Sequence, residues 1–433
     1  MHIYLKFRAN FSADLESVKE ELFKFWSGIH ETELRQSVEI ELSEDIMEVG
    51  VFFVDEPLKI EFFASHADFT LRTSNAGPGY HAASVKYFKM MSLACSLDID
   101  EKSVQDETGY WFSGDFPTLQ DYMAGWLRRL AANLLEEHAR TGRSNLLLNI
   151  PHYMLPDSQG HFACHSLGYL DIIFFEEIVQ RESFRPHCRA YFIWWNQEMD
   201  AEFHLKCALY IIWCRLNWLP PAVEHETTDY NNTLRCLDTA YGLDSRIMPL
   251  PLAEWMEIAR LIGDERLLFE LQERYAISMS QRSLRGYKRN RMMLCNMSDG
   301  WRLKVPGRMH MGHNDDGSLL FWDGTHSVRI SSLRVNLEGG APRPAAQILR
   351  EAVGDERVVR HILPADAGIE SYMLHAESVS GQRRFNEATL FSAIDGYIMI
   401  ISVFYPIGTP RSWAMDICNS LTPPWVETYK VLG

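Results

Sequence analysis

The sequence predicts a multi-domain α+β protein with an N-terminal α/β portion, a mainly helical middle and a C-terminal antiparallel sheet packed by two helices. Its 433 residues suit two or three domains. A hydrophobic fraction of 46% with 23% charged residues is typical of folded globular domains. Near residue 295, helix-spaced apolar residues give way to short β-branched and aromatic runs. We therefore expect domains at 1–99, 100–295 and 296–433.

The N-terminal portion mixes strand and helix patterns. Strands are predicted for "HIYLKF" and "VGVFFVDEPLKIEFFAS", which alternate apolar and polar residues or are rich in β-branched and aromatic ones. A helix capped by Ser12 or Asp14 is predicted for "ADLESVKEELFKFWSGI". Its apolar residues recur every three or four positions and share one helix face: Leu15, Val18, Leu22 and Trp26.

Helices are predicted for most of the middle portion. One is expected in "TLQDYMAGWLRRLAANLLEEHARTG", capped by Thr118 and ended by Gly142. A short buried strand is expected in "NLLLNIP". Further helices are predicted in "MDAEFHLKCALYIIWCRLNWL", "LAEWMEIARLIG" and "ERLLFELQERYAI", and a loop in "LPPAVEHETTDYNN".

The C-terminal portion reads as strands with two helices. Strands are predicted in "WRLKVP", "SLLFWDG", "HSVRISSLRV", "ESYMLHAESV", "FNEATLFSAI" and "YIMIISVFYP". The two helices are predicted in "PRPAAQILREAVG" and "PRSWAMDICNSLTPP". Strand pairs separated by such helices imply an antiparallel sheet with helices packed on it.

This order of elements, with Trp301 and Pro306 in the first strand, resembles the Mog1, PsbP and DcrB group of small α+β domains. The resemblance covers roughly residues 298 to 426 and rests on "GWRLKVPGRM", "VRISSLRV", "AAQILREAV", "FNEATLFSAIDGYIMIISVFYP" and "AMDICNSL". Members of this group mostly bind other proteins, and they include adaptors that hold effectors of bacterial type VI secretion. The resemblance therefore implies a protein-binding function by analogy.

Composition and charge exclude several classes of function. The formal net charge of −16 disfavours nucleic acid as a partner, because phosphate contacts need cationic side chains. The same charge favours association with a basic protein. We expect neither a secretory signal nor a membrane-spanning segment, and hence a cytoplasmic protein without membrane partners. The eight scattered cysteines predict reduced, buried thiols.

An acidic and aromatic cluster gives the main candidate binding surface. We expect it in a loop before and within "GYWFSGDF", with these partner-binding residues: Asp98, Asp100, Glu101, Asp106, Glu107, Tyr110, Trp111 and Asp115. The cluster fits a clasp for a basic partner, in which aromatic side chains anchor the contact. A metal or acid/base site and a solvated loop beside buried aromatics are the alternatives.

Three other motifs have a chemical and a structural interpretation. In "HFACH", a helix would align His161 and His165 as two zinc ligands, although no third ligand is evident, so they are weak metal candidates. The glycines of "GPGYH" fit either an anion site or a turn into a helix. The basic run from Arg282 to Arg291 fits a partner contact or the outer face of a linker helix.

We therefore expect a non-enzymatic protein-binding protein without cofactors, specifically an immunity protein that occludes the active site of a cognate bacterial toxin or effector. An adaptor or chaperone for a secreted effector is the first alternative. A metal-dependent hydrolase using His161 and His165 is the second. No nucleophile elbow is found in the sequence, and the pair His187 and Cys188 is adjacent, so that the two side chains point apart.

Overall fold

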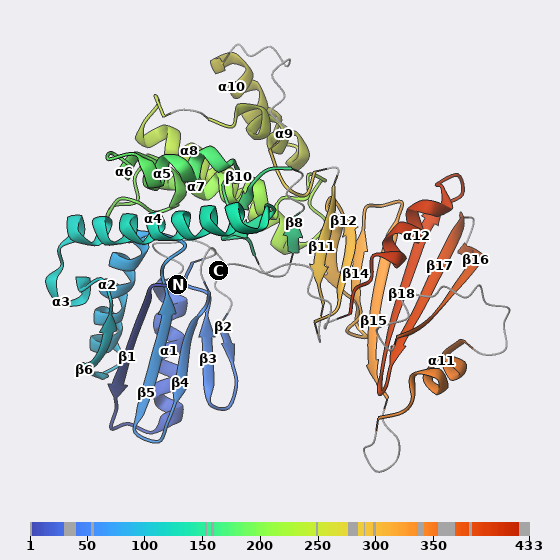
Figure 1. Ribbon diagram of the computed structural model, residues 1–433, viewed down its shortest axis with the longest axis horizontal. Coiled ribbons are helices and arrows are strands. Elements are labelled where there is room, and N and C mark those ends of the chain that lie inside the picture. Colours follow the sequence, from blue (N-terminus) through green and yellow to red (C-terminus); the bar gives the residue numbers. More distant parts are fainter. Residues whose placement is uncertain are drawn as a thin grey trace.

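The structure is a computed structural model of the 433-residue chain (Figure 1). It describes residues 2–29, 40–52, 56–151, 154–156, 160–247, 250–275, 285–289, 291–297, 300–335, 342–353, 369–380 and 383–423. Mostly antiparallel sheets and helices alternate along the chain in a mixed α+β fold, which confirms the predicted fold class.

The N-terminal part is a six-stranded antiparallel sheet with two helices against one face. The strand order is β2-β3-β4-β5-β1-β6. Its strands are β1 (Tyr4–Asn10), β2 (Ile40–Leu42), β3 (Ile46–Val49), β4 (Leu58–Phe62), β5 (His66–Arg72) and β6 (Asp98–Asp106). The helices α1 (Leu15–Ile29) and α2 (Pro78–Ala94) pack together on the sheet, since Phe88 contacts both Phe7 and Trp26 at ring distances of 4.9 and 6.0 Å. Of the two predicted caps of α1, Ser12 and Asp14, it is Asp14 whose carboxylate accepts from the Ser17 N–H in the first turn.

Helices dominate the middle of the chain. They are α3 (Tyr110–Ser113), α4 (Phe116–Thr141), α5 (Ile172–Gln180), α6 (Arg185–Tyr191), α7 (Ala201–Tyr210), η2 (Ile211–Arg215), α8 (Glu224–Leu243), α9 (Leu252–Ile262) and α10 (Glu265–Tyr275). Two predictions were wrong here. The cap of α4 is Asp115, which accepts from the Thr118 N–H. The expected loop ends at Val223, and the helix α8 begins at Glu224.

Two three-stranded sheets lie beside these helices. The first has the order β10-β9-β7, with β7 (Leu146–Leu148), β9 (Ala163–His165) and β10 (Gly168–Leu170). The second has the order β12-β11-β8, with β8 (Met154–Pro156), β11 (Met292–Asn296) and β12 (Arg302–Pro306). The second sheet therefore joins segments that are far apart in the sequence (Figure 1).

The C-terminal part is a second six-stranded antiparallel sheet in the order β13-β14-β15-β18-β17-β16. It comprises β13 (His310–His313), β14 (Leu319–Trp322), β15 (Ser327–Arg334), β16 (Glu370–Ser380), β17 (Arg383–Ile394) and β18 (Tyr397–Pro406). The helices α11 (Ala345–Val353) and α12 (Arg411–Asn419) pack on it, as the sequence predicted. Trp301, just before β12, stacks on Tyr397 of β18.

The sheets cross the expected domain limits at two places. The first sheet runs through β6 to Asp106, and β11 pairs with both β8 and β12. The expected domain limits at residues 99 and 295 therefore do not coincide with the ends of the sheets. That the three portions fold independently stays a prediction. All eight cysteines are buried, and none of them forms a disulfide. Within the described residues, no helix combines the length and the apolar character that crossing a bilayer requires.

Candidate functional site

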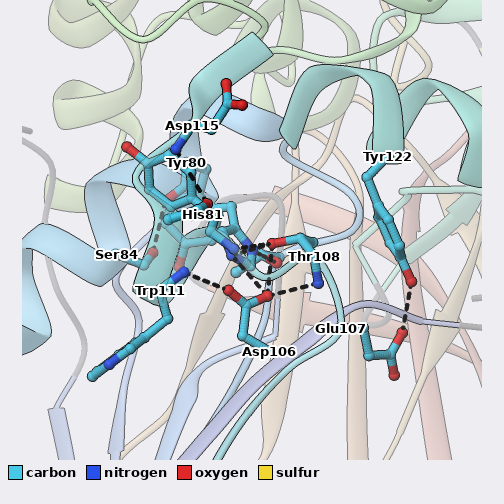
Figure 2. Close-up of polar contacts among 12 residues, drawn as sticks. Tyr80, His81, Ser84, Asp106, Glu107, Thr108, Trp111, Asp115 and Tyr122 are labelled. Atoms are coloured by element: carbon cyan, nitrogen blue, oxygen red, sulfur yellow. Dashed lines mark hydrogen bonds and ion pairs between the residues drawn. The ribbon is translucent and has the colours of Figure 1, made fainter. Parts of the chain in front are cut away.

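The acidic, aromatic cluster runs along β6 and through the turn that leads into α4. Figure 2 shows its second half, from Asp106 to Asp115. Its first half was expected in a loop, but residues 98–106 are a strand at the edge of the sheet, paired with β1. At the end of this strand, Asp106 turns its side chain inward, where only 1% of it is exposed. The expected loop is therefore a rigid edge strand that supports the turn after it.

Asp106 is the centre of a buried hydrogen-bond network. Its Oδ1 accepts from the N–H and the hydroxyl of Thr108 at 2.9 and 2.7 Å, and its Oδ2 accepts from the Trp111 N–H at 2.7 Å. The Nε2 of His81 lies 3.4 Å from Oδ1, while Nδ1 of this fully buried ring contacts the Thr73 hydroxyl at 2.9 Å. The carboxylate thus ties α2, β6 and α3 together.

The network also sets the charge of Asp106. Burial by itself would raise the pKa of this carboxyl, but the hydrogen bonds from His81, Thr108 and Trp111 outweigh burial and hold the pKa well below the ordinary 3.8. Asp106 is therefore ionised at neutral pH. A buried carboxylate that is fully hydrogen-bonded stabilises its surroundings and has no spare lone pair for a partner.

The short helix α3 directs its three aromatic side chains in different directions. Tyr110 and Trp111 are buried, and Trp111 packs on Phe7 at a ring distance of 5.2 Å. Phe112, by contrast, is 64% exposed. Gly109 and Gly114 flank α3 with left-handed backbones, φ 72° and 62°, which glycine adopts at little cost. The turn is thus held from below by Asp106 and presents Phe112 to solvent.

Exposed carboxylates lie on both sides of this ring in the sequence. Glu107 and Asp115 flank α3 on either side and are exposed, and Asp98 and Glu101 are exposed on β6. Glu107 accepts from the Tyr122 hydroxyl at 3.4 Å, and Asp115 caps α4 (Figure 2). We call Asp98, Glu101, Glu107, Phe112 and Asp115 the acidic rim. The half-buried Asp100 accepts from the Lys102 N–H and lies beside a bulge in the strand.

Seven of the eight residues predicted from the sequence divide into two groups, and the half-buried Asp100 belongs to neither. Asp106, Tyr110 and Trp111 lie inside the protein and position the turn, whereas Asp98, Glu101, Glu107 and Asp115 face solvent. Sequence reasoning gave no role to His81 and did not separate Phe112 from its buried neighbours. No local signal marks His81, because its partners Thr73 and Asp106 come from other elements.

The two histidines of "HFACH" do not share a helix, so the zinc alignment expected from one is wrong. His165 ends the strand β9, is fully buried, and accepts from the Leu167 N–H at 3.2 Å. Burial and the nearby Lys206 lower its pKa to about 3. His161 instead stacks on Tyr169 at 4.2 Å and pairs with Asp171 at 3.2 Å. In the described part of the chain, no three metal-ligating side chains come together.

The other motifs serve packing. The N–H of Gly79 in "GPGYH" donates to the carbonyl of Trp194 at 3.0 Å, so the segment is a turn into α2 docked on a loop and its amide is already used. Burial raises the pKa of the Cys188 thiol to about 12, which keeps it protonated and weakly nucleophilic beside His187.

The basic run is not a linker helix where the structure describes it. Residues 285–289 form a turn, and β11 begins at Met292. Arg289 lies over the Trp218 ring at 3.2 Å and pairs with Glu257 through both guanidinium nitrogens, at 2.9 and 2.7 Å. The amine of Lys288 donates to the carbonyl of Arg215 at 2.9 Å. These two cations therefore fasten the turn to α9 and η2. Arg282 lies outside the described residues.

Comparisons with known proteins show only partial likeness. No protein-family model matches the chain, and no curated protein is similar to it. Among solved structures, a crystal structure from Bacteroides thetaiotaomicron VPI-5482 matches 29% of this chain and 45% of its own, at 15% identity and a TM-score of 0.23. The solution structure of cyanobacterial PsbP (CyanoP) from Synechocystis sp. PCC 6803 matches 31% of this chain and 93% of its own, at 10% identity and a TM-score of 0.24.

The chain thus spans less than half of the Bacteroides protein that it matches. A PsbP structure is among the partial matches. At these TM-scores, neither likeness supports a conclusion about activity or partners.

Proposed function

We propose that this chain is a non-enzymatic protein-binding protein whose acidic rim binds a basic surface of its partner. The single observation that supports this most is the presentation of Phe112. A phenyl ring that is 64% exposed sits on a short helix whose Trp111 N–H donates to a buried carboxylate. The same carboxylate also binds Thr108, just before the helix, and contacts His81 of α2. Aromatic anchors on rigid supports are typical centres of protein interfaces, because little entropy is lost when they are buried.

The charge of the rim determines the kind of partner. Four carboxylates accompany one aromatic ring in the acidic rim, and the whole chain carries a formal net charge of −16. A basic partner would be steered to this surface over about one Debye length, roughly 8 Å at physiological salt. The partner class that fits is a protein with a cationic cleft, such as one that acts on a polyanion.

The particular role that we propose is that of an immunity protein. Its acidic rim would enter the cationic active-site cleft of a cognate bacterial toxin or effector and exclude the substrate. Charge complementarity and the rigid anchor support this role. The hydrolase is less well supported, because His161 and His165 have separate partners. The adaptor remains the alternative that the family resemblance suggests.

The test uses the purified full chain and the toxin candidate encoded beside its gene. We expect a stoichiometric complex without toxin activity, and an association rate that falls as salt rises. Phe112→Ala should weaken binding at least about tenfold. Phe269→Ala is the matched control, because this phenylalanine of α10 is exposed to a similar degree, 62%. Equal losses for both variants, or none for Phe112→Ala, would exclude the rim as the contact surface.

A further inference from the structure

A hollow of about 300 Å³ opens on the C-terminal sheet, far along the chain from the acidic rim. The strands β16, β17 and β18 form its floor, and the turn that leads into α12 closes one side. Most of the residues that line it have polar side chains: His375, Ala376, Glu377, Asn386, Glu387, Tyr405, Thr409 and Arg411. A site of this size accepts a ligand of a few heavy atoms.

The strand register places four of these side chains on one face of the sheet. Glu377 is opposite Asn386, and Asn386 is opposite Tyr405. Residues directly opposite each other on neighbouring strands share a face, as do residues two apart on one strand, which adds His375. Arg411, at the start of α12, reaches the same face, because its Nε donates to Nε2 of His375 at 3.2 Å.

This contact orients Arg411 and leaves its binding groups available. Only Nε is used by His375, so the two terminal nitrogens make no hydrogen bond within the described part of the chain. The same holds, among those residues, for the amide of Asn386 and the hydroxyl of Tyr405. Tyr405 is 3% exposed, so its ring is fixed. The hollow thus offers a charged fork and two further donors for an oxyanion.

A carboxylate of the lining limits the charge of that oxyanion. Glu377 pairs with Arg384 at 2.8 Å and remains 59% exposed, and Glu387 accepts from the Thr389 hydroxyl at 3.0 Å. Glu387 follows Asn386 on β17, so its side chain points to the opposite face of the sheet, and Glu377 is the carboxylate that shares the face of the hollow with Arg411. A carboxylate on this face disfavours a doubly charged phosphate. It suits a monoanion with a nitrogen donor next to it. We propose that the hollow binds the carboxylate end of an amino acid or of a peptide, with the carboxylate on Arg411.

The experiment is ligand-observed saturation-transfer NMR on the full chain with L-alanine and N-acetyl-L-alanine as observed probes. Inorganic phosphate has no carbon-bound proton to detect, so its binding is measured by competition against the alanine probe. We expect saturation of at least one alanine probe and weaker binding of phosphate. Stronger binding of L-alanine would identify a free amino acid as the ligand, and stronger binding of the acetylated probe a peptide end. Binding of neither alanine probe, or equally strong binding of phosphate, would overturn the proposal.

Variants connect the binding to the named residues. Arg411→Gln should weaken binding of the alanine probe at least about tenfold, and Tyr405→Phe should weaken it less. Arg350→Gln is the matched control, because Arg350 is an exposed arginine of α11, elsewhere on the domain. Circular dichroism confirms that each variant is folded. Unchanged binding by Arg411→Gln would reject this site. The inference is independent of the toxin partner, since its probes need no partner protein.

Discussion

His310 and Glu226, 84 residues apart in the sequence, form a buried hydrogen-bonded pair between the C-terminal sheet and α8. The imidazole Nδ1 lies 2.9 and 2.8 Å from the two carboxylate oxygens, and both side chains are at most 9% exposed. Asn217 Nδ2 donates to the same carboxylate at 2.8 Å, and the Ala222 N–H donates at 2.9 Å. The polar groups of this junction are thus paired.

A double-mutant cycle on this pair should show strong coupling. Glu226→Ala and His310→Ala should each destabilise the protein, because each leaves a buried polar partner unsatisfied. The coupling free energy from urea unfolding should be about 2 kcal/mol. The exposed pair Arg266 and Glu270 of α10, 3.0 Å apart, is the control and should couple near zero. Equal coupling in both cycles would contradict the structural role of the junction.

Replacing the buried carboxylate beneath the acidic rim should loosen the turn. Asp106→Asn keeps the shape but removes the charge that accepts from Trp111 and Thr108, at an expected cost of about 2 kcal/mol. Hydrogen exchange of residues 106–115 should speed up more than exchange in the C-terminal sheet. Uniform acceleration across the chain would mean that Asp106 supports the whole fold.

The same carboxylate gives an acid dependence with a defined sign. Its pKa in the folded state is below the ordinary 3.8, so it stabilises the fold above that value, and this stabilisation is lost as the pH falls through the folded-state pKa. Protection of residues 106–115 should therefore fall below about pH 4 in the wild type. Asp106→Asn should show a smaller change over this range.

The buried His165 should make the stability of the fold depend on pH in a second, higher range. Its pKa is lowered from 6.5 to about 3, so between these values the unfolded chain binds a proton that the folded chain does not. Stability should therefore decrease as the pH falls from 7 to 5, by about 2 kcal/mol from this group. His2 and His204 act in the same direction, so the measurement compares urea midpoints with those of His165→Phe. An identical pH slope in the variant would contradict the role of His165.

A pair of glycine substitutions should have opposite signs. A Cβ at Gly79 would collide with the Trp194 ring and the Asn196 carbonyl oxygen. Gly79→Ala should therefore lower the free energy of unfolding by about 2 kcal/mol, measured as a lower melting temperature. At Gly125, inside α4, the nearest atom is 3.6 Å away on a flexible arginine. Gly125→Ala should raise stability by about 0.5 kcal/mol through helix propensity.

The C-terminal strands and both of their helices could be predicted because their signal is local. In β18, buried residues alternate with more exposed ones over most of the strand, and turn residues bound it. The helix α8 was missed at its start because its inward face carries polar residues, including Glu226 and Asp229. Their partners His310 and Arg215 lie on other elements, which no local pattern reveals.

The candidate site was predictable in composition but not in orientation. The sequence indicates that acidic and aromatic residues cluster around α3. Whether a side chain faces inward depends on contacts such as His81 with Asp106, across 25 residues of chain. Phe112 follows two buried aromatic residues, Tyr110 and Trp111, and precedes the turn at Gly114. Its exposure likewise depends on tertiary packing.

The small sheet β12-β11-β8 has a consequence for how this chain can be divided. Met293 of β11 pairs with Pro156 on one side and with Val305 on the other, so this single strand bridges the helical middle and the C-terminal part. If the backbone were cut anywhere between residues 156 and 292, the two fragments would still share a continuous ladder of backbone hydrogen bonds. Such fragments should reassociate when mixed, as the halves of a split protein do.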